Sequence, residues 1–370
     1  MDDAAPQAPA PVDGDRPAAE AAAPRSRRAV LTAALRAQVA FGRSLAAAGE
    51  DVEMHGTVVH EAGGRVVAAY AALGALAALA ALLWPLRGGL VLLALIGSGL
   101  QDLDNRWSWV RRLVPRDIGR TVLAWRGAAT RPADGGPPGA PVVGRLPRRR
   151  VLVCLPSDAL RSRDVRRWAA APVALGIGLA LLGALAGAVD LSAARSILLA
   201  AAGLLGACML AGLVLDRVVR ESVGPGSGGA LAGRLLHHLR ERPLQHIDLA
   251  VAVVGGGALF HDGCEVLIRN HANRLPPDQT TLLAWEPAPG PLTHVARDGR
   301  LRMVDADPRL IEVAVALGLP ARVRCTAVGR AGSLGWRGLG LAGGVDEGER
   351  VVTSLVALLR ALDQPAGGRP

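Results

Sequence analysis

Two pairs of long uncharged runs interrupt an otherwise mixed pattern of hydrophobic and polar positions. Residues 66–86 carry no charge, and as a helix rising 1.5 Å per residue they reach roughly 30 Å, the thickness of a bilayer's hydrocarbon. A turn is predicted at residues 87–89, and residues 90–100 return from it. Residues 169–189 and 196–215 repeat the arrangement. The pattern predicts two transmembrane helical hairpins, although run 90–100 is short enough that a re-entrant or tilted segment stays open.

Shorter periodic segments surround these runs. Residues 29–48 have a helical apolar period that ends at Gly49, and residues 50–60 alternate like a strand. After Asp216, helical and strand-like segments alternate. The predicted helices are 229–241, 263–274, 307–317 and 346–362, and the predicted strands are 121–125, 151–155, 247–254, 280–285 and 321–328, with a hairpin-like stretch at 292–304. This alternation predicts an α/β fold with a largely parallel sheet and flanking helices, interrupted by the two hairpins.

The segments divide the chain into consecutive regions. They are a disordered tail (1–28), the first part of the α/β domain (29–60), transmembrane hairpin 1 (66–103), a basic juxtamembrane segment with α/β strands (104–168), transmembrane hairpin 2 (169–215), the main part of the α/β domain (216–362) and a loose tail (363–370).

Composition and charge support a membrane setting. Hydrophobic residues make up 51% of the 370 residues but aromatic residues only 3%, which is unusual for a soluble core. The net charge is +10, and arginines cluster beside the apolar runs, as in the stretch 105–120, where Trp107 and Trp109 suit the lipid headgroup zone. Lipid is therefore the expected partner, together with a possible membrane protein, and nucleic acid is not. The arginine bias predicts a multi-pass protein of the cell membrane with both termini and the α/β domain in the cytoplasm.

The four cysteines, Cys154, Cys208, Cys264 and Cys325, are far apart in the sequence and form no Cys-x-x-Cys pair. A zinc knuckle or a disulfide framework is not indicated. Buried, reduced thiols are the interpretation that fits a cytoplasmic domain.

The order of segments resembles the M28 family of zinc peptidases in its membrane-associated bacterial form. The stretches that carry the resemblance are AVLTAALRAQVAFGRSLAAAGEDVEM, LDNRWSWVRRLVPRDIGRTVLAW, VLVCLPSDA, VVRESVGPGSGGALAGRLLHHLRERPLQHIDLAVAVV, CEVLIRNHANRL and DGRLRMVDADPRLIEVAVALGLPARVR. The resemblance implies an α/β peptidase fold interrupted by apolar hairpins. It also implies two zinc ions held by two histidines and three acidic residues, with a further glutamate as base.

The positions where the family has these groups are mostly changed. Its His-x-Asp becomes Pro156-Ser157-Asp158, and a bridging aspartate gives way to the Ser-Gly-Gly that contains Gly228. Its Glu-Glu pair becomes Gly257-Ala258, and Glu286 stands where an aspartate is expected. Because one carboxylate cannot hold a zinc pair, the resemblance implies a pseudo-peptidase without cofactor or catalytic residues, acting in binding or scaffolding. Its remnant site would comprise Asp158, Glu286, Pro156, Gly228, Gly257 and Ala258.

Two other functions stay open. An active metal-dependent aminopeptidase or hydrolase could use relocated ligands, namely Asp158, Glu286, His261, Asp262 and Glu265. Of these, His261, Asp262 and Glu265 are weak metal candidates, because Asp262 before an apolar helix is more typical of a helix cap. A membrane transport subunit is the other alternative, although the apolar runs lack the intramembrane charge that transport pathways usually need.

Five other histidines are expected to be exposed to solvent. His55 and His60 are five residues apart in a strand-like run, so that their rings point to opposite faces, and an exposed pair is predicted. His237, His238 and His246 are predicted to lie on an exposed helix face and just after it.

Overall fold

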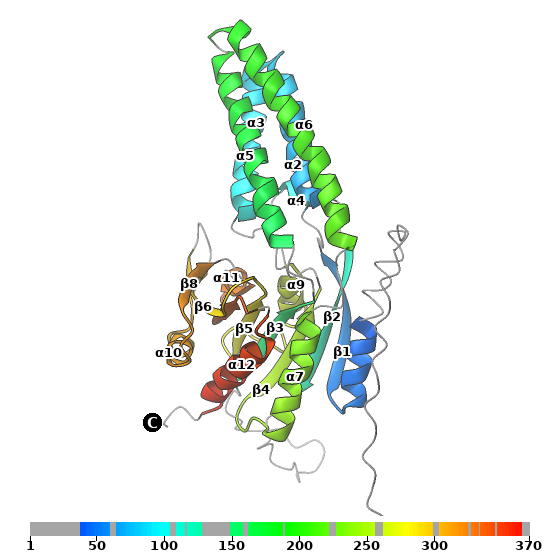
Figure 1. Cartoon of the computed structure of the whole chain (residues 1–370), viewed down its shortest axis with the longest axis vertical. Coiled ribbons are helices and arrows are strands. Elements are labelled where there is room, and N and C mark those ends of the chain that lie inside the picture. The colour runs from blue at the N-terminus through cyan, green and yellow to red at the C-terminus, as the bar shows by residue number, and fades with distance from the viewer. Residues whose placement is uncertain are drawn as a thin grey trace, which may run out of the picture.

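The computed structural model describes residues 38–59, 64–103, 109–114, 117–127, 149–157, 162–187, 189–221, 227–255, 262–298, 303–324, 327–332, 334–344 and 346–364. It has two parts, a bundle of long helices and an α/β domain beneath it (Figure 1). The chain passes from the domain into the bundle and back twice, so each excursion is a helical hairpin inserted between strands or helices of the domain.

Four helices build the bundle. They are α2 (Gly64–Ala81), α3 (Pro85–Leu103), α5 (Ser162–Ala186) and α6 (Leu191–Glu221), with the short α4 (Trp109–Leu113) at their base. The two helical hairpins are therefore confirmed, but the turn predicted at residues 87–89 is wrong. α3 already begins at Pro85, because proline is favoured in the first helical turn, where its missing N–H costs nothing.

The outer surface of the bundle is apolar. Most of the large hydrophobic side chains that are exposed in the described part of the chain lie on these hairpins, among them Leu83 (71% exposed), Leu86 (78%) and Leu182 (61%). Two stretches, Gly64–Ala81 and Ala194–Val214, are long and apolar enough to cross a membrane, and Pro85–Gln101 and Ala171–Ala186 are shorter apolar stretches. The bundle thus exposes the kind of surface that associates with lipid.

Small residues bring the bundle helices together. A Cβ atom on Gly183 would lie 3.0 Å from Leu198 Cγ, and one on Gly187 would lie 3.4 Å from the Cβ of Ala194. Glycines at these positions therefore allow α5 and α6 to pack closely. Between α2 and α3, the hydroxyls of Tyr70 and Ser98 share a buried hydrogen bond of 2.8 Å.

One mixed sheet forms the centre of the α/β domain. Within the described residues its strands are β1 (Asp51–Val59), β2 (Asp117–Arg126), β3 (Arg150–Pro156), β4 (Asp248–Val254), β5 (Thr280–Glu286), β6 (Thr293–Asp298), β7 (Val304–Asp305), β8 (Ala321–Arg324) and β9 (Arg337–Ala342). Their order is β1-β2-β4-β3-β5-β9-β6-β7, and β8 pairs with β6.

The prediction of a largely parallel sheet is corrected by this pairing. β4, β3, β5 and β9 are parallel neighbours, but β1, β2 and β4 pair antiparallel, as do β9, β6 and β7. The physical reason is the connection between β1 and β2. The chain enters the bundle after β1 and comes straight back down in β2, so no crossover helix places these two strands in parallel.

Helices cover both faces of the sheet. One face packs against a helix at residues 38–47 and against α7 (Ser227–Glu241), α10 (Pro308–Ala316) and α12 (Gly348–Asp363), and the other against α9 (Asp262–Asn270) and α11 (Ala327–Gly332). Successive residues of β3 alternate between the two cores: Val151 and Val153 belong to the first, Leu152 and Cys154 to the second.

Most element predictions in the domain are confirmed within a few residues, with two exceptions. Of the strand predicted at 321–328, Ala321–Arg324 forms β8 but Ala327 and Val328 begin α11, and β9 lies in the stretch after it, where no strand is predicted. In addition, Asp363 is the last residue of α12 rather than part of a tail, and its carboxylate accepts the backbone N–H groups of Gln245, His246 and Ile247 at 2.7–3.1 Å. The segment predicted to be a disordered tail, residues 1–28, lies outside the described residues. So does His60, which is predicted to be part of a strand.

Candidate functional site

The carboxyl ends of the parallel strands lie at the edge of the sheet that faces the bundle (Figure 1). This is where open α/β sheets usually bind ligands. β3 ends at Pro156, and β5, its neighbour, ends at Glu286. Of the predicted remnant site, the structure therefore brings Pro156, Glu286 and Gly228 to one edge, whereas Asp158, Gly257 and Ala258 lie outside the described residues.

The first turn of α7 packs directly against the end of β3. A Cβ atom placed on Gly228 would lie 2.1 Å from the carbonyl oxygen of Pro156, so no side chain fits at this position. Ser157 follows Pro156 and is fixed by its backbone N–H, which donates to Val254 O at 2.9 Å, while Gln38 Nε2 donates to its hydroxyl at 2.9 Å. A backbone contact therefore occupies the space beside the end of β3 at this position.

A second contact of the same kind lies at the end of β4. A Cβ atom on Gly263, in the first turn of α9, would lie 2.1 Å from the carbonyl oxygen of Gly255. Glycine is needed here because the helix backbone approaches the strand end too closely for any side chain. α7 and α9 both begin at this edge and are packed onto strand ends without space for a ligating side chain at the contact.

Two of the carboxylates predicted as ligands, Glu286 and Glu265, are buried but are on different elements. Glu286 is 6% exposed at the end of β5, where its carbonyl accepts from the backbone N–H of Gly343. Glu265, also 6% exposed, is in α9, and its carboxylate accepts from Arg269 at 2.7 Å, one helical turn later. Asp262 is the first residue of α9, and His261 lies outside the described residues, so the relocated-ligand hypothesis remains without support from the described part.

Two of the cysteines meet in the core. The Sγ atoms of Cys154 on β3 and Cys264 on α9 are 3.2 Å apart, close enough for an S–H···S hydrogen bond, although 110 residues separate them in the sequence. This hydrogen bond and burial raise the pKa of the Cys154 thiol well above its ordinary value. Because the thiolate is the reactive form, this environment favours the less reactive, protonated thiol at Cys154. Cys154, Cys208 and Cys264 are free and buried, as predicted.

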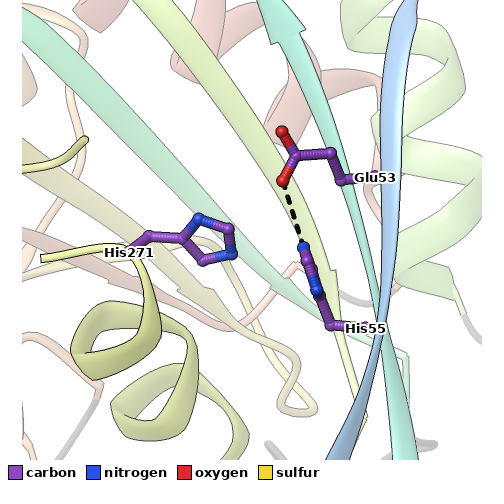
Figure 2. Close-up of side chains that lie close together, drawn as sticks. All are labelled: Glu53, His55 and His271. Atoms are coloured by element: carbon purple, nitrogen blue, oxygen red, sulfur yellow. Dashed lines mark hydrogen bonds and ion pairs between the residues drawn. The ribbon is translucent and has the colours of Figure 1, made fainter. Parts of the chain in front are cut away.

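Sequence reasoning missed a polar cluster on the edge strand. Glu53 and His55 alternate along β1 and so share one face of the sheet, where His271, just after α9, meets them (Figure 2). His55, predicted to be exposed, is only partly so: its side chain is 37% exposed, and its Nε2 donates to Glu53 Oε2 at 3.1 Å. The i, i+2 spacing of Glu53 and His55 was a usable signal, but nothing in the sequence points from them to His271.

The charges of the cluster follow from its neighbours. Burial raises the pKa of Glu53, but hydrogen bonds from Arg274 and His55 outweigh this effect, and the net result is a pKa below the ordinary value. Burial lowers the pKa of His271, and the neighbouring His55 lowers it further. An ionised Glu53 beside a neutral His271 is the resulting state near neutral pH.

The histidines predicted to be exposed on α7 and just after it are exposed in the structure. The side chains of His237 and His238 are 70% and 46% exposed and lie near Glu241 and Glu349, and His246 is exposed after the helix. At this exposure the contacts with the two glutamates contribute little to stability.

Comparison with protein-family models, with curated proteins and with solved structures found no match to this chain.

Proposed function

We propose that this chain is an integral membrane protein with an M28-peptidase-like α/β domain that has lost peptidase chemistry and serves in binding or scaffolding at the membrane surface. The observation that carries the proposal is the contact between Gly228 and Pro156. The position at which the resemblance implies a zinc-bridging carboxylate has no side chain and no space for one, and the position at which it implies a histidine is a proline without a donor atom.

The placement of this edge supports a role beside the membrane. β3 leads into α5 and α6 leads into α7, so the carboxyl ends of the strands face the base of the bundle. A partner that reaches this edge would approach along the lipid surface. Without two metal ions to activate water at neutral pH, such a surface can bind but cannot hydrolyse a peptide by the family's mechanism.

An activity assay tests the loss of chemistry. The full chain, purified in detergent and supplied with Zn²⁺, should release no more nitroaniline from a panel of aminoacyl-p-nitroanilides than buffer does. Zinc-dependent turnover that disappears in Glu286→Gln would overturn the proposal, since Glu286 is the one predicted ligand that both is described and lies at the strand ends. Glu241→Gln, which changes an exposed carboxylate on α7, is the matched control.

A topology assay tests the membrane part of the proposal. The helical hairpins should keep the chain in the membrane pellet after carbonate extraction, and reporters fused after residue 364 and within the hairpin tip at Asp190 should report opposite sides. A cytoplasmic signal is expected at the carboxyl terminus, because arginines flank the domain side of each hairpin whereas the tips carry only Arg87 and Arg195. Recovery of the chain in the soluble fraction, or the same side for both fusions, contradicts this arrangement.

A further inference from the structure

The cluster of Glu53, His55 and His271 brings three potential metal ligands to one point. One ligand atom from each residue can be chosen so that all lie within 4.8 Å of one another. The rings of His55 and His271 meet edge to face, with centroids 4.8 Å apart, and the Glu53 carboxylate closes the third side (Figure 2). This cluster is on the edge strand β1 and is separate from the strand ends that Gly228 and Pro156 occupy.

Each ligand is positioned by ordered backbone. Glu53 and His55 are paired in register with Leu123 and Thr121 of β2, so both side chains leave the same face of a regular strand. His271 sits in a tight turn in which its N–H donates to Leu267 O at 3.0 Å and its carbonyl accepts from Leu275 N at 2.8 Å. Sites built on such fixed elements lose little conformational entropy when an ion binds.

Arg274 holds the carboxylate of Glu53 in place. Its guanidinium donates to Oε1 of Glu53 and stacks on Trp125, 4.1 Å from the centre of the ring system. The other oxygen, Oε2, faces His55. A partner of this kind, which binds one oxygen of a ligating carboxylate and leaves the other free to coordinate, is typical of the outer shell of metal sites.

We propose that Glu53 Oε2, His55 Nε2 and one ring nitrogen of His271 bind a single divalent transition-metal ion, with zinc as the best fit. Two imidazoles and one carboxylate suit Zn²⁺ and its first-row neighbours, whereas Mg²⁺ and Ca²⁺ prefer oxygen ligands alone. Ligands at about 2.0–2.2 Å from one ion lie roughly 3–3.5 Å apart, so the cluster closes by about 1 Å on binding. With His55 half-exposed, the fourth position opens to solvent and takes water or a donor from a partner.

The alternative to a metal site is a purely structural cluster, in which His55 and Glu53 form a hydrogen bond beside a buried histidine. The two interpretations differ in whether the protein binds added metal. The full chain, purified with a tag free of histidine and stripped with a chelator, is titrated with ZnCl₂ by calorimetry, and with CoCl₂ to record the visible spectrum of a four-coordinate site. One ion per chain is expected. His55→Ala, His271→Ala and Glu53→Gln should each weaken binding at least about tenfold.

His237→Ala is the matched control, since His237 is an exposed histidine that also lies near a glutamate, 3.5 Å from Glu241. It should bind as the parent does. Absence of saturable binding, or equal loss in His237→Ala, overturns the proposal. Because His271 is buried, His55→Ala and Glu53→Gln keep the test decisive if His271→Ala fails to fold. If the chain binds two ions and keeps them in His55→Ala, both this metal site and the proposed loss of the family's zinc pair are contradicted. If it binds one ion and loses it in His55→Ala, this metal site is supported and the proposed function is unaffected.

Discussion

Gly228→Ala should destabilise the α/β domain by about 2–3 kcal/mol. The added methyl group would lie 2.1 Å from the carbonyl oxygen of Pro156, far inside van der Waals contact, and the atom it meets is backbone rather than a flexible side chain. α7 must therefore move off the end of β3, which also disturbs its buried leucines Leu231 and Leu235 against the sheet. The measurement is thermal unfolding of the detergent-solubilised chain followed by tryptophan fluorescence, with a decrease of roughly 5–10 °C expected.

Gly233→Ala, on the same helix, is the matched control for this prediction. Its new methyl group would be 3.9 Å from the ring of Phe41, an ordinary contact, and alanine is the better helix former. This variant should be as stable as the parent or more stable by up to about 1 kcal/mol. If Gly228→Ala proves equally stable, then α7 does not rest on the end of β3, and the observation on which the proposed function depends is lost.

Glu50→Ala should lower the free energy of unfolding by about 3 kcal/mol. The Glu50 side chain is 4% exposed and its Oε1 accepts from both Arg126 on β2 and Arg240 on α7, the latter at 2.9 Å. These bonds tie the end of the helix at residues 38–47 to the sheet and to α7. Removing the carboxylate leaves two guanidinium groups close together, and Arg126, only 17% exposed, cannot regain full hydration.

The comparison for Glu50 is Glu349→Ala on α12. The Glu349 carboxylate also has two partners, Arg234 at 3.9 Å and His238 at 3.6 Å, but it is 69% exposed. Its loss should change the free energy of unfolding by no more than about 0.5 kcal/mol. Urea titration of both variants in the same detergent measures the difference, and equal effects would show that burial of Glu50 contributes nothing.

Local signals predicted the elements that carry strong periodicity or clear end signals. Gly49 was predicted to end the first helix and adopts a φ of +83°, a conformation open to glycine at little cost. Asp307 before Pro308 begins α10 and accepts the N–H of Arg309 at 3.0 Å. In these places the residues that decide the backbone are neighbours in the chain, so the sequence contains all of the required information.

β9 is a strand that local sequence signals do not predict. No strand is predicted from its sequence, Arg-Gly-Leu-Gly-Leu-Ala, yet it lies inside the sheet between β5 and β6. The reason is tertiary: a Cβ atom on Gly338 would lie 1.9 Å from the carbonyl oxygen of Leu282, so glycine is required by the close approach of β5. No pattern within β9 reveals which strand will lie beside it.

The candidate sites, too, depend partly on sequence and partly on tertiary contacts. The resemblance in segment order placed Pro156, Gly228 and Glu286 at one edge of the sheet, but only the structure shows that the backbone of α7 fills the gap beside Pro156. The cluster of Glu53, His55 and His271 depends on a contact across more than 200 residues and was not predicted.

By itself, the sequence determined that this protein has two apolar helical hairpins and an α/β domain, because hydrophobic runs and periodicity are properties of short segments. The tertiary structure alone decided that the sheet is mixed, that glycines seat α7 and α9 on strand ends, and that Cys154 meets Cys264. These features are contacts between segments that are far apart in the sequence. Such contacts stabilise the fold only once the chain has brought both partners together.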